Sequence, residues 1–129
     1  MIFDTDVVIW LLRADATAIQ AVESTPERAI SIVTFMELAQ GLRAKREIRT
    51  IRQLLRDWEF TVLPLSATIG YVAASFIEQF APSSGLDVPD ALIAATAVEY
   101  SDTLTTANIR HFREIPRLTL KTFRPTRAQ

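Results

Sequence analysis

The chain has 129 residues and a net charge of −1, and 49% of its residues are hydrophobic, which favours one folded domain over a disordered segment. It contains no cysteine, so disulfides, iron–sulfur clusters and thiolate zinc sites are excluded. No apolar run approaches the ~20 residues that span a bilayer, and no basic leader precedes the apolar start, so we expect a single domain at 1–129, without a membrane segment, in the cytoplasm.

The first half of the chain alternates short β-type segments with helical ones. In chain order, we predict a strand at 2–3 that ends at Asp4, helices at 7–13 and 17–24, a strand at 29–33, a helix that begins at Thr34, and a helix at 43–58. The start at Thr34 follows from the T-x-x-E form of Thr34 to Glu37, which is typical of a capping box.

The second half continues the alternation. In chain order, we predict a strand at 60–63, a helix capped by Ser66 or Thr68 that runs to Phe80, a loop at 82–85, a helix at 91–100 opened by Asp90, and strands at 103–105 and 118–120. This order of elements predicts an α/β fold with a mainly parallel central sheet and helices on both faces. Ligands of such sheets bind at the carboxyl ends of the strands.

Three acidic residues stand at the borders of apolar segments: Asp4, Glu37 and Asp90. Three carboxylates brought together at one sheet edge would repel one another and lose hydration unless a cation neutralised them. Ligation by oxygen alone selects hard ions such as Mg²⁺ or Mn²⁺. These acids are therefore our candidates for a metal site.

Each of the three acids also has a purely structural interpretation. Asp4 can cap a helix that begins at Val7, and Glu37 can reach back to the Thr34 amide in the capping box. Asp90 can be the N-cap of the helix that follows it. Spacing alone leaves both interpretations open.

Acidic and basic residues are segregated along the chain. Residues 43–58 carry six basic residues, residues 59–102 carry six acidic residues and no base, and residues 110–127 carry six further bases. Two basic zones around an acidic centre suit a polyanion whose cleavage site holds a cation. The helix at 43–58 presents Arg46, Arg49, Arg52 and Arg56 on one face, which is either a solvated face or a nucleic-acid contact.

Four motifs, spread from Asp4 to Phe112, resemble those of the PIN-domain family, and within it the VapC-like toxin ribonucleases. The motifs are Asp4-Thr5-Asp6-Val7-Val8-Ile9, the segment 31–41 with its acid at Glu37, Pro89-Asp90-Ala91-Leu92-Ile93-Ala94-Ala95-Thr96-Ala97, and Thr105-Thr106-Ala107-Asn108-Ile109-Arg110-His111-Phe112. The resemblance implies a PIN-like three-layer α/β/α sandwich.

The resemblance also implies a function. It implies a Mg²⁺- or Mn²⁺-dependent endoribonuclease, the toxin of a type II toxin–antitoxin pair, with a cognate antitoxin and a homodimeric state. Asp4, Glu37 and Asp90 carry over as the metal-site acids. Our hypothesis for the chemistry is attack on the phosphodiester by a metal-activated water. The apolar residues of the helix at 67–80 independently favour a homodimer.

Many relatives have a fourth acid in the last motif, where this chain has Asn108, Ile109 and His111. A catalytically inactive PIN module that binds RNA or antitoxin is therefore the alternative function. We expect one tightly bound ion, with Asp6 and Asp87 as the first further ligands if a second one binds. Candidates for support of the site are Thr5, Asp87, Thr105 and Asn108. Candidates for RNA contact are Arg46, Arg49, Arg52, Arg110 and His111.

Overall fold

The computed structural model describes residues 1–42 and 45–126, and its centre is a sheet of five strands in the order β3-β2-β1-β4-β5. The strands are β1 (Ile2–Phe3), β2 (Arg28–Ser31), β3 (Phe60–Leu63), β4 (Thr103–Thr106) and β5 (Thr119–Thr122). Every neighbouring pair is parallel. The predicted α/β class is confirmed, and the sheet is wholly rather than mainly parallel.

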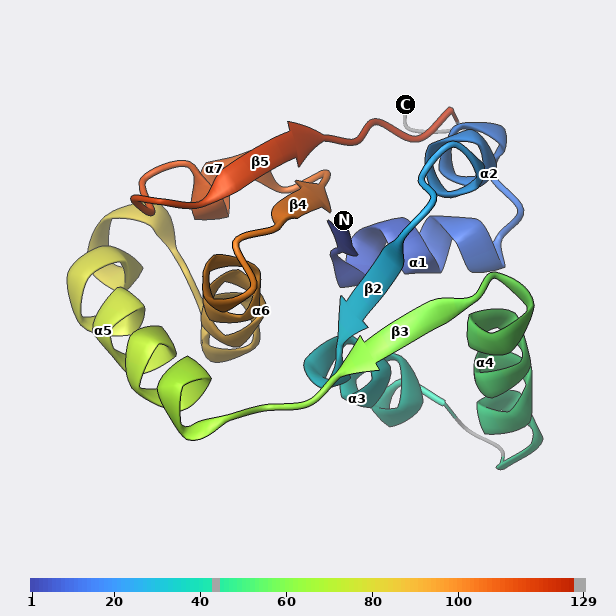
Figure 1. Cartoon of the computed structure of the whole chain (residues 1–129), viewed down its shortest axis with the longest axis horizontal. Coiled ribbons are helices and arrows are strands. Elements are labelled where there is room, and N and C mark those ends of the chain that lie inside the picture. Colours follow the sequence, from blue (N-terminus) through green and yellow to red (C-terminus); the bar gives the residue numbers. More distant parts are fainter. Residues whose placement is uncertain (43–44, 127–129) are drawn as a thin grey trace.

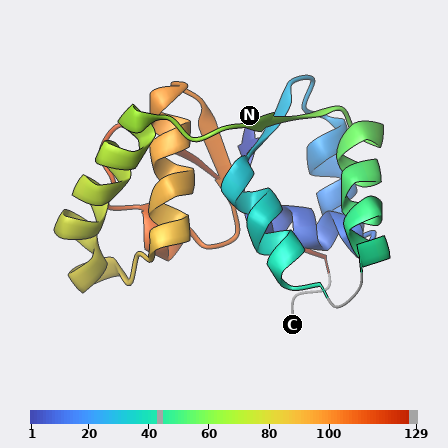
Figure 2. The same ribbon diagram turned by 90° about the horizontal axis from the view of Figure 1, so that it is seen from below.

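Helices cover both faces of this sheet (Figures 1 and 2). They are α1 (Thr5–Leu12), α2 (Ala16–Glu23), α3 (Ile32–Gln40), α4 (Lys45–Asp57), α5 (Ala67–Ser84), α6 (Val88–Glu99) and the short α7 (Ile109–Phe112). Because side chains alternate along a strand, Ile2 packs into one apolar cluster with α5 and α6, whereas Phe3 packs into another with α1, α2 and α4. The predicted three-layer sandwich is confirmed.

The order of the strands reverses between β1 and β4. The chain adds β2 and β3 on one side of β1, and then returns to add β4 and β5 on the other side. In open α/β sheets, ligands bind outside the carboxyl ends of the strands at such a reversal. Asp4 follows β1 directly, and Thr106 is the last residue of β4.

Helix α3 begins earlier than the capping-box motif predicts. Its N-cap is Ser31, whose hydroxyl accepts a hydrogen bond from the Val33 N–H over 3.1 Å. The predicted start at Thr34 is therefore wrong, and β2 ends at Ser31 instead of continuing to residue 33. Glu37 consequently lies in the second turn of α3, where it is free of any capping role.

Helix α6 begins at Val88, and its N-cap is Asp87. The Asp87 carboxylate accepts a hydrogen bond from the Asp90 N–H over 2.9 Å, and Pro89 suits the first turn because a backbone N–H is not required there. The interpretation of Asp90 as the N-cap is wrong. Asp90 instead lies in the first turn of the helix, with its side chain available for other contacts.

Helix α5 runs on to Ser84, so the predicted loop at 82–85 is wrong. The helix tolerates Pro82 because the hydrogen bonds around it persist: the Ser84 hydroxyl donates to the Phe80 carbonyl over 2.8 Å, and the Gly85 N–H donates to the Ala81 carbonyl over 3.1 Å. Gly85 then ends the helix at a φ of 74°, a conformation that glycine adopts without strain.

Helix α4 has the predicted amphipathic character. Ile51 and Leu55 are buried, whereas Arg46, Arg49 and Arg52 are exposed. The predicted start at residue 43 lies outside the described residues. The four-residue helix α7 was not predicted, because so short a segment shows no periodicity.

The apolar residues of α5 pack largely within the subunit. Ile69, Ala73 and Phe76 are buried, and Ile77 and Phe80 are partly buried against the same cluster. The apolar surface of α5, on which the predicted homodimer depends, is therefore mostly covered by the chain itself. The homodimer stays a prediction. Among the described residues, no helix is both long and apolar enough to cross a membrane.

Candidate active site

Asp4 lies where the strand order reverses, directly after β1. Its N–H donates to the Thr105 carbonyl over 2.9 Å, which holds it against β4. One carboxylate oxygen accepts from the Thr5 N–H at 2.8 Å and the other from the Thr106 hydroxyl at 2.7 Å. Asp4 therefore caps α1, although the helix begins at Thr5 rather than at Val7, and 5% of its surface is exposed.

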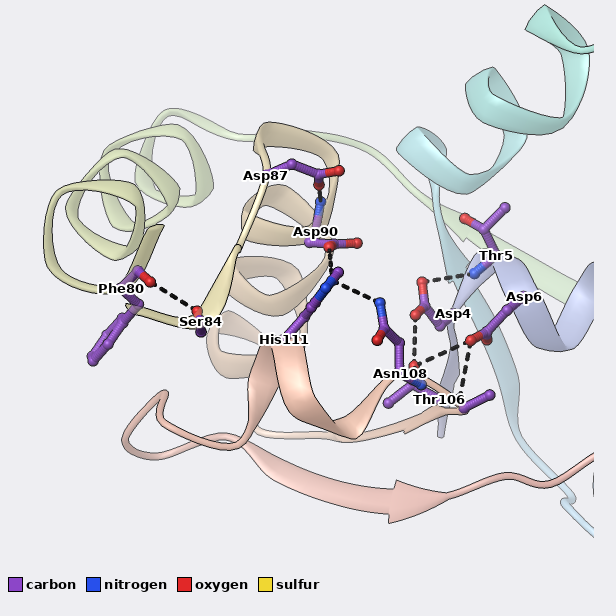
Figure 3. Close-up of polar contacts among 11 residues, drawn as sticks. Asp4, Thr5, Asp6, Phe80, Ser84, Asp87, Asp90, Thr106, Asn108 and His111 are labelled. Carbon is purple, nitrogen blue, oxygen red and sulfur yellow. Dashed lines mark hydrogen bonds and ion pairs between the residues drawn. The ribbon is translucent and has the colours of Figure 1, made fainter. Parts of the chain in front are cut away.

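Asp6 faces the same end of β4 from the first turn of α1 (Figure 3). Its Oδ2 accepts a hydrogen bond from the Ala107 N–H over 3.0 Å. Its Oδ1 is buried and has no hydrogen-bond partner within the described part of the chain. A buried carboxylate oxygen without a donor is costly. The sequence indicates Asp6 only as a further ligand for a second ion; the signal for a larger role is its spacing of two residues from Asp4.

Glu37 approaches the site from α3. The Thr5 hydroxyl donates to Glu37 Oε1 over 2.6 Å and makes a second hydrogen bond of 3.0 Å with Thr34 Oγ1. These bonds tie the start of α1 to α3 and show that Thr5 hydrogen-bonds a carboxylate, whereas its role in the site stays a prediction. Because α3 begins at Ile32 with Ser31 as its N-cap, Glu37 lies beyond the first turn, and its carboxylate contacts Thr5.

Asp90 approaches from the opposite side, on α6. Its Oδ2 lies 3.0 Å from His111 Nδ1, and the Asn108 side-chain nitrogen lies 2.7 Å from the same ring nitrogen (Figure 3). The last motif therefore contributes His111 and Asn108 to the side of the site on which Asp90 lies. Asp87, as the cap of α6, contacts the backbone N–H of Asp90 rather than the Asp90 carboxylate.

The electrostatics of the site disfavour ionised carboxylates. Burial raises the pKa of Asp4 from 3.8 to about 7, and the nearby charges of Asp6 and Glu37 raise it further against the hydrogen bonds that lower it. Burial likewise raises the pKa of Asp90 from 3.8 to about 7, with added repulsion from Asp87 and Asp4. Burial also raises the pKa of Asp6. The charges of these acids repel one another across the site, and a bound cation would lower the pKa of each of them.

The donor set of the site consists of carboxylate and hydroxyl oxygens, which suits Mg²⁺ or Mn²⁺. Within residues 1–42 and 45–126, no three His, Cys, Asp or Glu side chains group closely enough to hold one ion directly. Mg²⁺ keeps several waters and binds proteins through one or two carboxylates, so it does not require three closely grouped acids. The unpartnered Oδ1 of Asp6 provides a further oxygen. The residues present thus fit a hydrated divalent ion.

Other candidate residues lie in different places. The Thr105 hydroxyl hydrogen-bonds the Met1 sulfur, so Thr105 does not hold a carboxylate; the next residue, Thr106, does so because it faces Asp4. Arg110 and His111 belong to α7 beside the site. Arg52 lies on the exposed face of α4, with its guanidinium 4.7 Å from the Phe35 ring.

Comparisons with known proteins agree with this architecture. The PIN domain family model matches residues 1–118. A protein named Ribonuclease VapC from Rickettsia bellii (strain RML369-C) is 30% identical over 128 residues, which cover 95% of each chain. A structure titled "Toxin-antitoxin complex from Klebsiella pneumoniae" superposes with a TM-score of 0.76 at 30% identity, covering 92% of this chain and 94% of that one. VapBC2 from Rickettsia felis, bound to a DNA fragment, gives a TM-score of 0.79 at 21% identity, covering 96% and 100% of the two chains, and shows the shared fold.

Proposed function

The chain belongs to the PIN domain family, as a VapC-like member, and from this premise we propose that it is a Mg²⁺- or Mn²⁺-dependent endoribonuclease and the toxin of a type II toxin–antitoxin pair. We propose Asp4, Glu37 and Asp90 as the acids of its metal site, with Asp6 as an additional one.

One observation carries this proposal. The buried Asp4 at the start of α1 and the partly buried Asp90 of α6 repel one another at the reversal of the strand order, where the pKa values of both rise to about 7 and one oxygen of Asp6 has no partner within the described chain. Purely structural carboxylates would have a donor for each buried oxygen. A cluster of carboxyl groups whose ionised forms are destabilised is typical of a site that binds a cation or performs catalysis.

The side chains of the site have distinct tasks in this proposal. When bound, a divalent ion supplies a Lewis acid that neutralises phosphate charge and lowers the pKa of the attacking water. The hydroxyl of Thr106 fixes Asp4, and the hydroxyl of Thr5 fixes Glu37. His111 fixes Asp90 from the other side. Such supporting hydrogen bonds keep the acids oriented while the RNA binds.

The antitoxin is the second partner that we propose. The solved structure from Klebsiella pneumoniae that resembles this chain is a toxin–antitoxin complex. Carboxylates that repel one another attract a guanidinium, whose planar fork matches carboxylate geometry. We therefore propose that the antitoxin inserts an arginine among the acids and so competes with the metal ion.

Cleavage of a mixed RNA pool tests the proposed activity. The protein alone, with Mg²⁺ or Mn²⁺, should cut RNA, and chelation of the metal should stop the cleavage. Asp4→Asn should bring cleavage below detection, whereas Glu99→Gln, an exposed carboxylate at the far end of α6, should leave it unchanged. If both variants cut equally, the activity belongs to a contaminating nuclease and the proposal fails.

The neutral last motif, which places Asn108 and His111 beside Asp90, favours a second candidate function. In that case the protein binds RNA or antitoxin without cutting RNA. An RNA mobility shift without any metal-dependent cleavage, under conditions in which the protein is folded, would identify this inactive module.

A further inference from the structure

A cavity of about 340 Å³ lies beside the acidic site, between the end of α5 and α7. Its size is at the small end of the range of ~300–1,000 Å³ that is typical of ligand pockets. Gly85, Arg110, His111, Arg113 and Glu114 are among the residues that line it. The mechanism proposed above uses only one of these residues, His111.

The imidazole ring of His111 is the wall between this cavity and the acidic site. Its Nδ1 lies 3.0 Å from Asp90 Oδ2. Its Nε2 is directed the other way, towards Gly85, where a Cβ would lie 3.9 Å from that nitrogen. Figure 3 shows the ring between Ser84 and Asp90. A nucleotide in the cavity would therefore be a direct neighbour of a phosphate held at the acids.

The walls of the cavity offer both donors and an acceptor. Arg110 and Arg113 are exposed, and within the described residues neither forms an ion pair. The Glu114 carboxylate is exposed and accepts one hydrogen bond, from the Ser83 hydroxyl over 3.0 Å. Two guanidinium groups and a carboxylate that do not pair with one another are available to a ligand.

Guanine is the RNA base whose edges match this set. An arginine fork donates to its O6 and N7 atoms, the commonest specific contact to guanine in nucleic-acid complexes. A carboxylate accepts hydrogen bonds from its N1–H and N2–H groups, whereas adenine has no N1–H and presents an amino group in place of O6. A bare phosphate would use the arginines but would be repelled by Glu114.

We propose that this cavity binds the guanine base of a nucleotide adjacent to the scissile phosphate. Arg110 or Arg113 contacts the O6 and N7 edge, and Glu114 contacts the N1 and N2 edge. The cavity thereby gives the enzyme a preference for guanine at one position next to the cleaved bond, since unpaired bases of single-stranded RNA are recognised by such edge contacts. This inference rests on the proposed ribonuclease function, which it extends to sequence choice.

Binding of mononucleotides to the metal-free protein tests the cavity without any catalysis. In amide NMR titrations, guanosine monophosphate should bind about tenfold more tightly than adenosine monophosphate and should shift the signals of Gly85 and His111. Glu114→Gln should remove this preference, and its matched control Glu99→Gln should retain it. Equal binding of all four nucleotides, or no binding near Gly85, would overturn the inference.

Cleavage of short RNAs with a single guanine moved along an adenine and uracil background is the second test. The wild type should favour one guanine position by about tenfold in kcat/KM. Arg113→Ala or Arg110→Ala should weaken that preference, whereas Arg124→Ala, which removes an equal charge elsewhere, should not. Cleavage without any guanine preference would overturn the inference and leave the proposed function intact. Absence of all cleavage would instead refute the proposed function, and the mononucleotide titration would still decide the inference.

Discussion

Substitution of Asp4 by asparagine should separate the function of the site from the stability of the fold. Burial raises the pKa of Asp4 from 3.8 to about 7. Between these two values the folded protein holds a proton that the unfolded chain has lost, so stability falls as the pH rises through this range. Above about pH 7 the penalty is complete. At about 1.4 kcal/mol per pKa unit, the ionised carboxylate then destabilises the metal-free protein by about 4 kcal/mol.

Asparagine removes this penalty but keeps most of the local geometry. Its oxygen still accepts one of the two hydrogen bonds that Asp4 receives from the Thr5 N–H and the Thr106 hydroxyl. The loss of the other costs about 1 kcal/mol. The metal-free variant should therefore exceed the wild type in stability by about 3 kcal/mol at pH 8, but by only about 1 kcal/mol at pH 5, where the carboxylate penalty is about 2 kcal/mol.

Thermal unfolding in a chelating buffer at pH 5 and pH 8 measures this difference. At pH 8 the Tm of Asp4→Asn should exceed that of the wild type by about 10 °C. Added Mg²⁺ should raise the Tm of the wild type and leave that of the variant unchanged. The exposed control Glu99→Gln should show no such pH dependence. A Tm difference between Asp4→Asn and the wild type that is equal at both pH values would refute the raised pKa on which this argument depends.

Four further predictions concern other residues of the fold and the site, metal binding and the antitoxin. Glu37→Gln and Asp90→Asn should each bring RNA cleavage below detection with an unchanged circular dichroism spectrum; residual activity near the wild-type level in either variant would remove that acid from the metal site. Ser31→Ala should destabilise the protein by about 1 kcal/mol in urea unfolding, because Ser31 caps α3, whereas equal stability would show that the cap is dispensable. Calorimetric titration with Mn²⁺ should find one tight site, which Asn108→Asp should strengthen; two tight sites in the wild type would indicate that Asp6 or Asp87 is a full ligand. Addition of the antitoxin should weaken Mn²⁺ binding, and unchanged affinity in the complex would mean that the antitoxin inhibits by covering the path of the RNA.

Local patterns in the sequence were sufficient for the class of the fold. The alternation of β-branched segments with apolar helical periods predicts a parallel sheet covered on both faces, because each element must bury its own apolar face. The same patterns, together with the PIN-like motifs, identify Asp4, Glu37 and Asp90 as the acids to consider. Hydrophobic periodicity carries this information because it depends on each segment alone.

Only the tertiary structure decided which contacts each acid makes. The T-x-x-E pattern at Thr34 and Glu37 fits a capping box, but the chain leaves β2 three residues earlier, and Ser31 caps α3 instead. Two helix starts that differ by one turn have similar local free energies, so packing against α1 and the sheet selects between them. The sequence also could not predict which residues hydrogen-bond these acids. Thr106 is 102 positions from Asp4 and His111 is 21 positions from Asp90, and these pairs meet only because β4 inserts beside β1 and α7 folds back over α6. Long-range strand order therefore determines the site, while the sequence determines which residues can serve it.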